Sequence, residues 1–267
     1  MFLLGIINSK WTLLKGKEKT RRKVGIYFSI PFLVFFLFAI SGLSNEQENK
    51  KEILPAITWD WTYGGGNNES ASSIIQTTDG GYAVAGSTDS EGAGQSDSWV
   101  IKLDEQGKMV WDWTYGGSGY DMAFSLVQTT DGGYAVAGSI FSKGASEIDF
   151  WVIKLDEQGK MVWDRTYGGS GFEQAFSLIQ TTGGGYAVAG SILSKDTGKM
   201  DFWVIKLDEQ GKMVWDWTYG GGNNDQARSL IQTTDGGYAV AGWTTSKGAG
   251  EMDFWVIKLD ENGNLNK

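Results

Sequence analysis

Tryptophan recurs in this chain at a fixed spacing that constrains the fold more than any other feature. Four tryptophans lie 52 residues apart, and each opens a copy of one unit: Trp59, Trp111, Trp163 and Trp215. The second copy reads WDWTYGGSGYDMAFSLVQTTDGGYAVAGSIFSKGASEIDFWVIKLDEQGKMV, and the third differs from it at 12 of 52 positions. A period of this size predicts a repeated supersecondary unit, as in solenoids, propellers or arrays.

Each copy contains short β-branched and aromatic runs separated by glycine-rich turns. In the second copy the predicted strands are 125–130, 134–137, 150–155 and 161–167. Asp131-Gly132-Gly133 and Asp156-Glu-Gln-Gly159 are typical turn sequences, because these residues tolerate positive φ. No part of the unit has a helical period. Four short antiparallel strands per repeat are typical of a propeller blade.

The fold class we expect is therefore all-β, a β-propeller of four four-stranded blades over residues 58–267. Small side chains in the first two strands favour the propeller axis, and the tryptophans favour the rim. The segment 58–63 is an outer strand without the three strands that should precede it, and the last copy stops before its own outer strand. We expect this N-terminal strand to close the last blade, which removes exposed strand edges. A ring of eight blades from two chains, or an open stack, are the alternatives.

The N-terminal part of the chain is apolar and has a basic flank. Residues 1–23 hold seven basic residues and one acidic residue, and 24–43 carry no charge. A span of about 20 apolar residues crosses a bilayer as a helix. With the basic segment 1–23 in the cytoplasm, we expect one transmembrane helix at 24–43, a polar linker at 44–57 and an external C-terminal body on the cell membrane. A cleaved signal sequence, with secretion, is the alternative.

Composition narrows the chemistry available to the chain. It has no cysteine and no histidine, which excludes disulfides, thiolate sites, and the commonest general base and metal ligand. The net charge of −9 combines +6 in residues 1–43 with −15 in the rest. So acidic a body repels nucleic acid, and we expect no nucleic-acid partner.

The repeat also resembles a known family. The motifs are W-x-x-T-Y-G-G-[GS]-x-x-[DE]-x-A, then S-[LI]-[IV]-Q-T-T-D-G-G-Y-A-V-A-G, then D-[SF]-W-V-I-K-L-D-E-[QN]-G. They are similar to the repeats of SBBP-like exported β-propeller proteins of bacteria and archaea, over residues 59–263. The strand-turn-strand around Trp151 also looks like quinoprotein repeats. These resemblances imply blade geometry and an exported repeat protein, and neither implies a quinone cofactor or an activity.

Carboxylates recur in register with the tryptophans. One set follows the Gly-Gly element of each copy: Glu69, Asp121, Glu173 and Asp225. We expect each of them to cap its loop by accepting backbone N–H bonds. The alternative is a circle of four carboxylates at the channel mouth that holds Ca²⁺ through oxygen ligands.

A second set precedes the tryptophan strand of each copy: Asp97, Asp149, Asp201 and Asp253. The connection that leads to this set differs most between copies, and variable loops often carry function. We expect this connection and the link between copies to lie on one face of the disc, which is the predicted binding surface. Unconstrained drift of the loop is the alternative.

Other repeated charges have structural interpretations. Lysines within the tryptophan strand should pair with nearby carboxylates or reach solvent: Lys102, Lys154, Lys206 and Lys258. Aspartates at the exit of that strand should form turns: Asp104, Asp156, Asp208 and Asp260. Two positions break the repeat, since Arg165 replaces a tryptophan and Gly183 replaces an aspartate.

The function we expect is a non-catalytic, surface-displayed propeller that binds or scaffolds a protein or carbohydrate partner, as a monomer or homodimer. Near-equal copies argue against catalysis, because acid/base pairs need two carboxylates in different environments. We therefore assign no catalytic residue and no cofactor beyond the Ca²⁺ alternative. A carboxylate-dependent carbohydrate-active enzyme and a self-assembling structural surface protein are the two alternative functions.

Overall fold

Strands account for most of the chain that the computed structural model describes, namely residues 58–141, 147–169 and 171–265. The first sheet contains β1 (Glu69–Gln76), β2 (Tyr82–Thr88), β3 (Asp97–Leu103) and β4 (Met109–Tyr115). The second contains β5 (Met122–Gln128), β6 (Tyr134–Ile140), β7 (Asp149–Leu155) and β8 (Met161–Tyr167). The third contains β9 (Gln174–Gln180), β10 (Tyr186–Leu193), β11 (Met200–Leu207) and β12 (Met213–Tyr219). The fourth contains β13 (Asp225–Gln232), β14 (Tyr238–Thr244) and β15 (Asp253–Leu259).

The chain is all-β, and every antiparallel sheet has its strands in sequence order. The first three sheets each combine three strands of one 52-residue copy with the tryptophan strand that opens the next copy. The predicted strands and turns of the second sheet are present with different bounds: β5 begins earlier than predicted, at Met122, and β6 continues past Ala137 to Ile140. The first strand of the second sheet, β5, ends at Gln128, two residues before the predicted end at 130. Thr129 and Thr130 instead enter the turn, where the N–H of Thr129 donates to the carbonyl of Gly133 at 2.9 Å.

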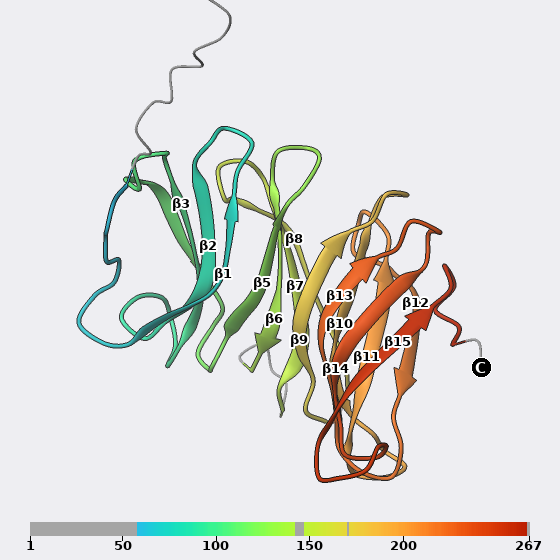
Figure 1. Cartoon of the computed structure of the whole chain (residues 1–267). Coiled ribbons are helices and arrows are strands. Elements are labelled where there is room, and N and C mark those ends of the chain that lie inside the picture. The colour runs from blue at the N-terminus through green and yellow to red at the C-terminus, as the bar shows by residue number, and fades with distance from the viewer. Residues whose placement is uncertain (1–57, 142–146, 170, 266–267) are drawn as a thin grey trace, which may run out of the picture. The chain divides into compact units, whose positions relative to one another are not determined.

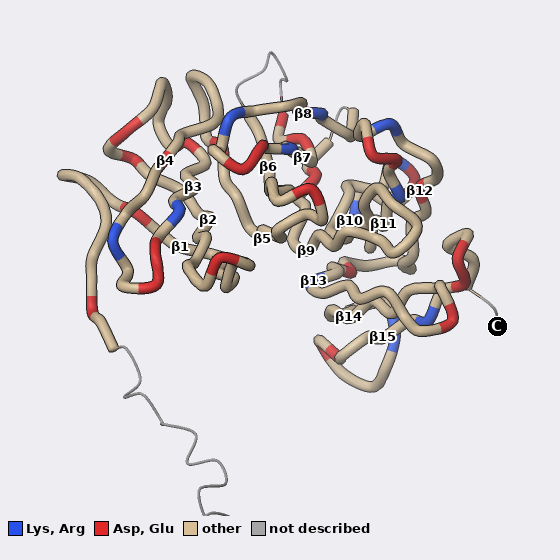
Figure 2. The backbone as a smooth tube through the Cα atoms, turned by 90° about the horizontal axis from the view of Figure 1, so that it is seen from above, with Lys and Arg blue, Asp and Glu red and all other residues tan. Residues whose placement is uncertain are grey.

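Neighbouring sheets follow one another in chain order within residues 58–265 (Figures 1 and 2). The first strands of successive sheets contact one another, β1 with β5, β5 with β9 and β9 with β13. In the first three sheets the fourth strand, which carries a tryptophan, lies at the opposite edge. The predicted order of strands, with small side chains on the inner side, is therefore confirmed.

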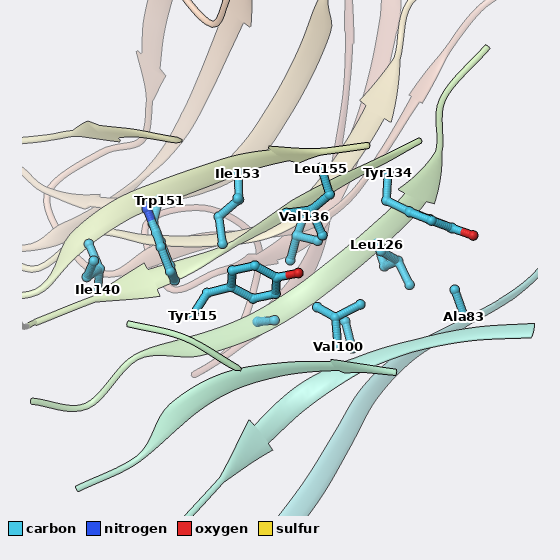
Figure 3. Packing of buried hydrophobic residues seen from close by; sticks show 12 residues of the cluster. Ala83, Val100, Tyr115, Leu126, Tyr134, Val136, Ile140, Trp151, Ile153 and Leu155 are labelled. Carbon is cyan, nitrogen blue, oxygen red and sulfur yellow. The ribbon is translucent and has the colours of Figure 1, made fainter. Parts of the chain in front are cut away.

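The hydrophobic core lies between successive sheets. Figure 3 shows Val100 and Tyr115 of the first sheet beside Leu126, Val136 and Ile153 of the second. All five of these side chains are buried. Alternation along each strand sends every second side chain into such a junction. Each sheet is therefore stabilised by its neighbours, as in other repeat architectures.

A glycine in the second strand of each sheet permits a β-bulge in the first strand. In the second sheet the pairing shifts between Ala123 and Ser125, opposite Gly138. A Cβ added to Gly138 would lie 1.8 Å from the carbonyl oxygen of Met122. Gly86, Gly190 and Gly242 meet a backbone carbonyl in the same way, at 1.9, 1.8 and 2.0 Å. This close approach explains the glycine of the Ala-Val-Ala-Gly motif.

The fourth sheet has three strands within the described residues. The segment 58–63 is not assigned to a strand and is not paired with β15. Closure of the last blade by this segment is thus not present in the structure and stays a prediction. The predicted membrane span, 24–43, lies outside the described residues, as do 1–23 and 44–57. Among the residues that are described, no helix is long and apolar enough to cross a membrane.

Candidate functional site: carboxylate pairs on the loop face

Two kinds of connection meet on one side of the sheets, and we call this side the loop face. It consists of the links from the second to the third strand and the links from each sheet to the next. The N–H of Asp121 donates to Ser96 O, and the N–H of Glu173 donates to Ile148 O, both at 2.8 Å. These bonds join a loop of one sheet to the entry of the next, so the predicted common face is confirmed.

The two predicted sets of carboxylates come together in pairs across the sheet junctions. At Gly116, an added Cβ would lie 2.3 Å from Asp121 Oδ2 and 2.4 Å from Asp97 Oδ1. A Cβ added to Gly168 would lie 2.5 Å from Glu173 Oε2 and 2.8 Å from Asp149 Oδ1. Each junction therefore brings one acid of each set around the first glycine of the Tyr-Gly-Gly motif.

The third pair is Asp201 with Asp225, beside Gly220. An added Cβ there would lie 1.8 Å from Asp201 Oδ1 and 3.0 Å from Asp225 Oδ2. At the two ends of the row of sheets, Glu69 lies beside Gly64 and Asp253 lies beside Gly248, each without a second carboxylate next to that glycine. The loop face thus has three complete pairs and two separated members of a fourth.

The carboxylates cap their loops, as predicted. Asp121 accepts the N–H of Gly117 at 2.8 Å and that of Phe141 at 2.9 Å. Asp97 Oδ2 accepts two N–H bonds, from Ala93 and Gly94, both at 3.0 Å. These bonds hold the variable connections against the sheets.

The capping hydrogen bonds do not reach every carboxylate oxygen of these acids. Three buried oxygens accept no hydrogen bond within the described residues: Glu173 Oε2, Asp201 Oδ1 and Asp225 Oδ1. Glu173 is 2% exposed and Asp225 is fully buried. A buried carboxylate oxygen without a donor is unfavourable, so these atoms can accept a bond from a ligand or can be protonated.

Burial raises the pKa values of three of these acids. It raises the pKa of Glu173 to about 7, an effect that the Gly169 N–H opposes and the Asp149 charge reinforces. Burial and then the Asp225 charge raise the pKa of Asp201. Burial also raises the pKa of Asp97, against two backbone hydrogen bonds that lower it. Desolvation thus makes Glu173, Asp201 and Asp97 weaker acids than exposed carboxyl groups.

The junction between the second and third sheets opens into a cavity of about 540 Å³. Its lining includes Glu173, Asp201, Ser194, Lys195 and Trp203. Lys195 belongs to the third copy's variable connection, and it lowers the pKa of Glu173 slightly. The cavity therefore gathers a cation, a hydroxyl group and two weak acids, which distinguishes this junction from a set of equivalent ones.

The four acids of the first set do not form one metal-binding group. In the part of the chain that the structure describes, no three Asp or Glu residues are placed to hold a metal ion together. Each acid belongs instead to its own junction. The arrangement gives no support to the Ca²⁺ alternative.

The opposite side of the sheets carries the tight turns and a row of ion pairs. Lys102 pairs with Asp79 and Lys154 with Asp131, both at 2.9 Å, and Lys258 pairs with Asp235 at 2.8 Å. The lysine in the third sheet, Lys206, faces the Gly183 turn and donates to the carbonyls of Gly184 and Leu207. Burial lowers its pKa. The lysine pairing was thus predicted correctly, and Gly183 explains the exception.

Sequence reasoning missed the pairing of the two acid sets. A signal was present, because each acid of the second set precedes its partner by 24 residues: Asp97 and Asp121, Asp149 and Glu173, Asp201 and Asp225. A constant offset in a repeat protein places two residues at one recurrent position. Which side of the junction each acid occupies still required the tertiary structure.

The fold and the loop face define a class: an all-β protein of tandem antiparallel sheets with acidic pairs at the sheet junctions. No protein-family model matches the chain. A regulatory protein, FlaEY of Caulobacter vibrioides, is 25% identical over 187 residues, which are 60% of this chain and 20% of that protein. The chain thus spans a fifth of the length of this curated relative.

Solved structures of low similarity share repeated β-sheets with this chain. The WD40 domain of Neurospora crassa Pan2 is 11% identical, with 74% of this chain and 65% of that chain covered and a TM-score of 0.45. A Bacteroides caccae protein of unknown function is 12% identical, covering 77% and 83%, with a TM-score of 0.34. Sqt1 of Chaetomium thermophilum is 13% identical, covering 76% and 72%, with a TM-score of 0.29. At such low identity and overlap, these likenesses carry no argument about function.

Proposed function

We propose that this chain is a non-catalytic β-propeller module that is displayed outside the cytoplasmic membrane and binds a carbohydrate on its loop face. The observation that carries the proposal is the cavity between the second and third sheets. Its volume, about 540 Å³, lies within the range of about 300–1,000 Å³ typical of ligand pockets. Two residues of its lining, Glu173 and Asp201, each have a buried carboxylate oxygen without a hydrogen-bond partner within the described residues.

The chemistry of the lining favours a polyhydroxyl ligand over a metal ion. Sugar hydroxyl groups donate to carboxylate oxygens and accept from an ammonium group, and Glu173, Asp201 and Lys195 provide both kinds of partner. Asp196 and Asp216 add further acceptors for hydroxyl groups to the lining, and within the described residues no three of these acids are placed to hold a metal ion together. A neutral ligand with many hydroxyl groups suits the lining better.

One observation favours the alternative of a carboxylate-dependent glycosidase. The pKa of Glu173, raised to about 7, is suited to a general acid. Its neighbour in the cavity, Asp201, also has a raised pKa. A glycosidase needs a second carboxylate that stays ionised while the first is protonated. Glu173 and Asp201 do not offer this contrast, because both shifts have the same direction; Asp196 and Asp216 are the further carboxylates of the lining.

Display on the membrane is supported by the order of charges along the chain. A basic segment at 1–23, an uncharged apolar segment at 24–43 and an acidic body follow one another. Cytoplasmic flanks of membrane spans are enriched in basic residues. The fold part of the proposal is that the four sheets are blades of a propeller, with 58–63 as the outer strand of the last blade.

The test is a glycan-binding screen with the full chain in detergent micelles. We expect retention of at least one glycan class, and Glu173→Gln should weaken that binding about tenfold, through loss of a charge-assisted hydrogen bond. The matched control is Glu261→Gln, in the last tight turn, which should bind as the unaltered chain does. Failure to retain any glycan, or equal binding by both variants, would refute the proposal. Release of reducing sugar from the bound glycan would favour the glycosidase.

A further inference from the structure

The junctions between sheets have recurrent contacts. At the second and third junctions a phenylalanine of the third strand packs on the tryptophan of the next sheet, Phe150 on Trp203 and Phe202 on Trp255, with ring centroids 4.9 and 4.5 Å apart; at the first junction Ser98 has the phenylalanine's position. A serine of each first strand also accepts an N–H bond from the next sheet, as Ser125 does from Leu178 at 3.0 Å. The two sheets at a junction therefore have constant roles. We call the face that carries the phenylalanine position the donating surface, and the face of the next sheet that carries the tryptophan the receiving surface.

The fourth sheet carries an unused donating surface. Phe254 occupies the position of Phe150 and Phe202, which are fully buried, yet it is 98% exposed. Val256 is 68% exposed, while Val152 at the same position of its sheet is fully buried. Large apolar side chains exposed at positions that are otherwise buried mark a missing partner.

The first sheet carries the matching receiving surface. Ile74 is 61% exposed, whereas Leu126 at the same position of the second sheet is 2% exposed. Beside it lies a cavity of about 350 Å³ whose lining includes Trp99, Trp59 and Tyr63. Trp99 occupies the position of Trp203 and Trp255, each of which receives a phenylalanine, so the cavity lies where a preceding sheet would pack.

The segment 58–63 already occupies part of that missing sheet. Trp59 and Trp61 donate their indole N–H groups to the carbonyls of Glu105 and Gln106, at 3.2 and 3.3 Å. The hydroxyl of Tyr63 donates to the carbonyl of Gly107.

These bonds match those of an outer strand on the following sheet. In β4, Trp113 donates to the carbonyl of Gln158 at 3.0 Å, and Tyr115 donates to that of Gly159 at 2.5 Å. The segment 58–63 thus has the contacts of an outer strand on the following sheet, and within the described residues the fourth sheet has no outer strand.

We infer that the fourth sheet of one copy docks on the first sheet of a second copy, and that two copies close one ring through two identical junctions of this kind. β15 of each copy pairs with 58–63 of the other, and Phe254 enters the cavity beside Trp99. The same contact brings Asp253 next to Glu69, which completes the fourth carboxylate pair. This inference extends the propeller part of the proposed function and is independent of carbohydrate binding.

A second copy fits as the occupant because its first sheet offers the uncovered face around Trp99 that Phe254 matches, and the first and fourth sheets of one chain do not meet. Within the described residues, no strand pairing and no hydrogen bond joins the first sheet to the fourth. The two sheets lie at opposite ends of the row in Figure 2. Junctions with the same contacts turn the chain by similar amounts, and three of them leave the ends apart. A head-to-tail contact closes a ring once the repeated rotation is complete, and eight blades lie within the range of about 4–8 known for propellers.

The register of the new pair follows from the third sheet, where Val204 lies opposite Trp217. The equivalent residues are Val256 and Trp61. Because the chain contains no cysteine, the double variant Trp61→Cys/Val256→Cys provides the only two thiols. Arg165 stands where other copies have this tryptophan, so the position accepts a different side chain.

The experiment is oxidative cross-linking of the full-length double variant, read on a non-reducing gel. We expect a covalent dimer of twice 29.2 kDa that reduction converts to monomer, with no larger species. Cross-strand partners share a face, so Asp60→Cys/Val256→Cys, with one thiol on the other face, should give little dimer. When the single variants Trp61→Cys and Val256→Cys are mixed, one disulfide should link one copy of each.

Three results would overturn the inference. A monomer with both thiols consumed would mean that each chain closes on itself. A ladder of higher species would mean an open array. Absence of any cross-link, together with a monomeric mass for the unaltered chain by light scattering, would mean that the two surfaces do not meet. Glycan binding by the same samples tests the proposed function separately.

Discussion

Replacing Glu173 by glutamine should change how the stability of the protein depends on pH. Glu173 is 2% exposed, and burial raises its pKa from the ordinary 4.5 to about 7. Between these values the folded state binds the proton more tightly than the unfolded state does. The free energy of unfolding of the unaltered protein therefore falls as the pH rises from about 5 to about 7, and the full cost remains at higher pH.

The size of the effect follows from the same shift. Each tenfold change in proton affinity corresponds to about 1.4 kcal/mol, so a rise from 4.5 to about 7 costs about 3 kcal/mol above pH 7. Glutamine carries no charge at any pH, so Glu173→Gln removes this dependence. Asp149 and Asp201, whose pKa values burial also raises, keep a smaller slope of the same sign in the variant.

The assay is urea unfolding followed by tryptophan fluorescence at pH 5, 6, 7 and 8. The difference in unfolding free energy between Glu173→Gln and the unaltered protein should shift by about 3 kcal/mol in favour of the variant over this range. An unpaired amide in the cavity changes that difference by an amount that does not depend on pH. Glu261→Gln serves as the control and should give a constant difference. Parallel curves for Glu173→Gln and the unaltered protein would refute the reasoning.

Three further changes test the fold and its assembly. Phe254→Glu places a charge in the proposed contact between copies and should convert the dimer to monomer in light scattering, while the single chain stays folded, because Phe254 is 98% exposed there. Gly138→Ala should cost about 3 kcal/mol or prevent folding, since the new Cβ would lie 1.8 Å from a backbone carbonyl, whereas Gly183→Ala meets nothing within 4 Å; equal unfolding midpoints would contradict this. Gly183→Asp should give Lys206 an ion pair and stabilise the third sheet by up to about 1 kcal/mol, measured by urea unfolding.

Local structure could be predicted because it depends on short stretches of sequence. The turn at Asp131-Gly132-Gly133 and the strand that begins at Tyr134 lie where the glycines and the β-branched run place them. The turn predicted at Asp156 is present, and the Asp156 carboxylate accepts the N–H groups of Gln158 and Lys160 at 3.0 and 2.8 Å. Each of these contacts joins residues within a few positions of each other.

The candidate site was predicted in part. The sequence indicated which acids recur and that they cap loops, and the bonds to Asp121 and Asp97 agree. It did not indicate that the two sets meet, because the residues of a pair belong to different sheets. It also did not reveal the raised pKa of Glu173, which arises from burial rather than from neighbours in the chain.

The 52-residue period by itself determined the all-β class, the strand order within each sheet and the offset of the segment 58–63. These follow from hydrophobic alternation and turn chemistry, which act over short distances along the chain. Only the tertiary structure decided which surfaces remain uncovered. Phe150 and Phe254 have the same local sequence, yet one is fully buried and the other 98% exposed. Burial depends on whether another sheet packs on that position, and the sequence of the repeat does not show this.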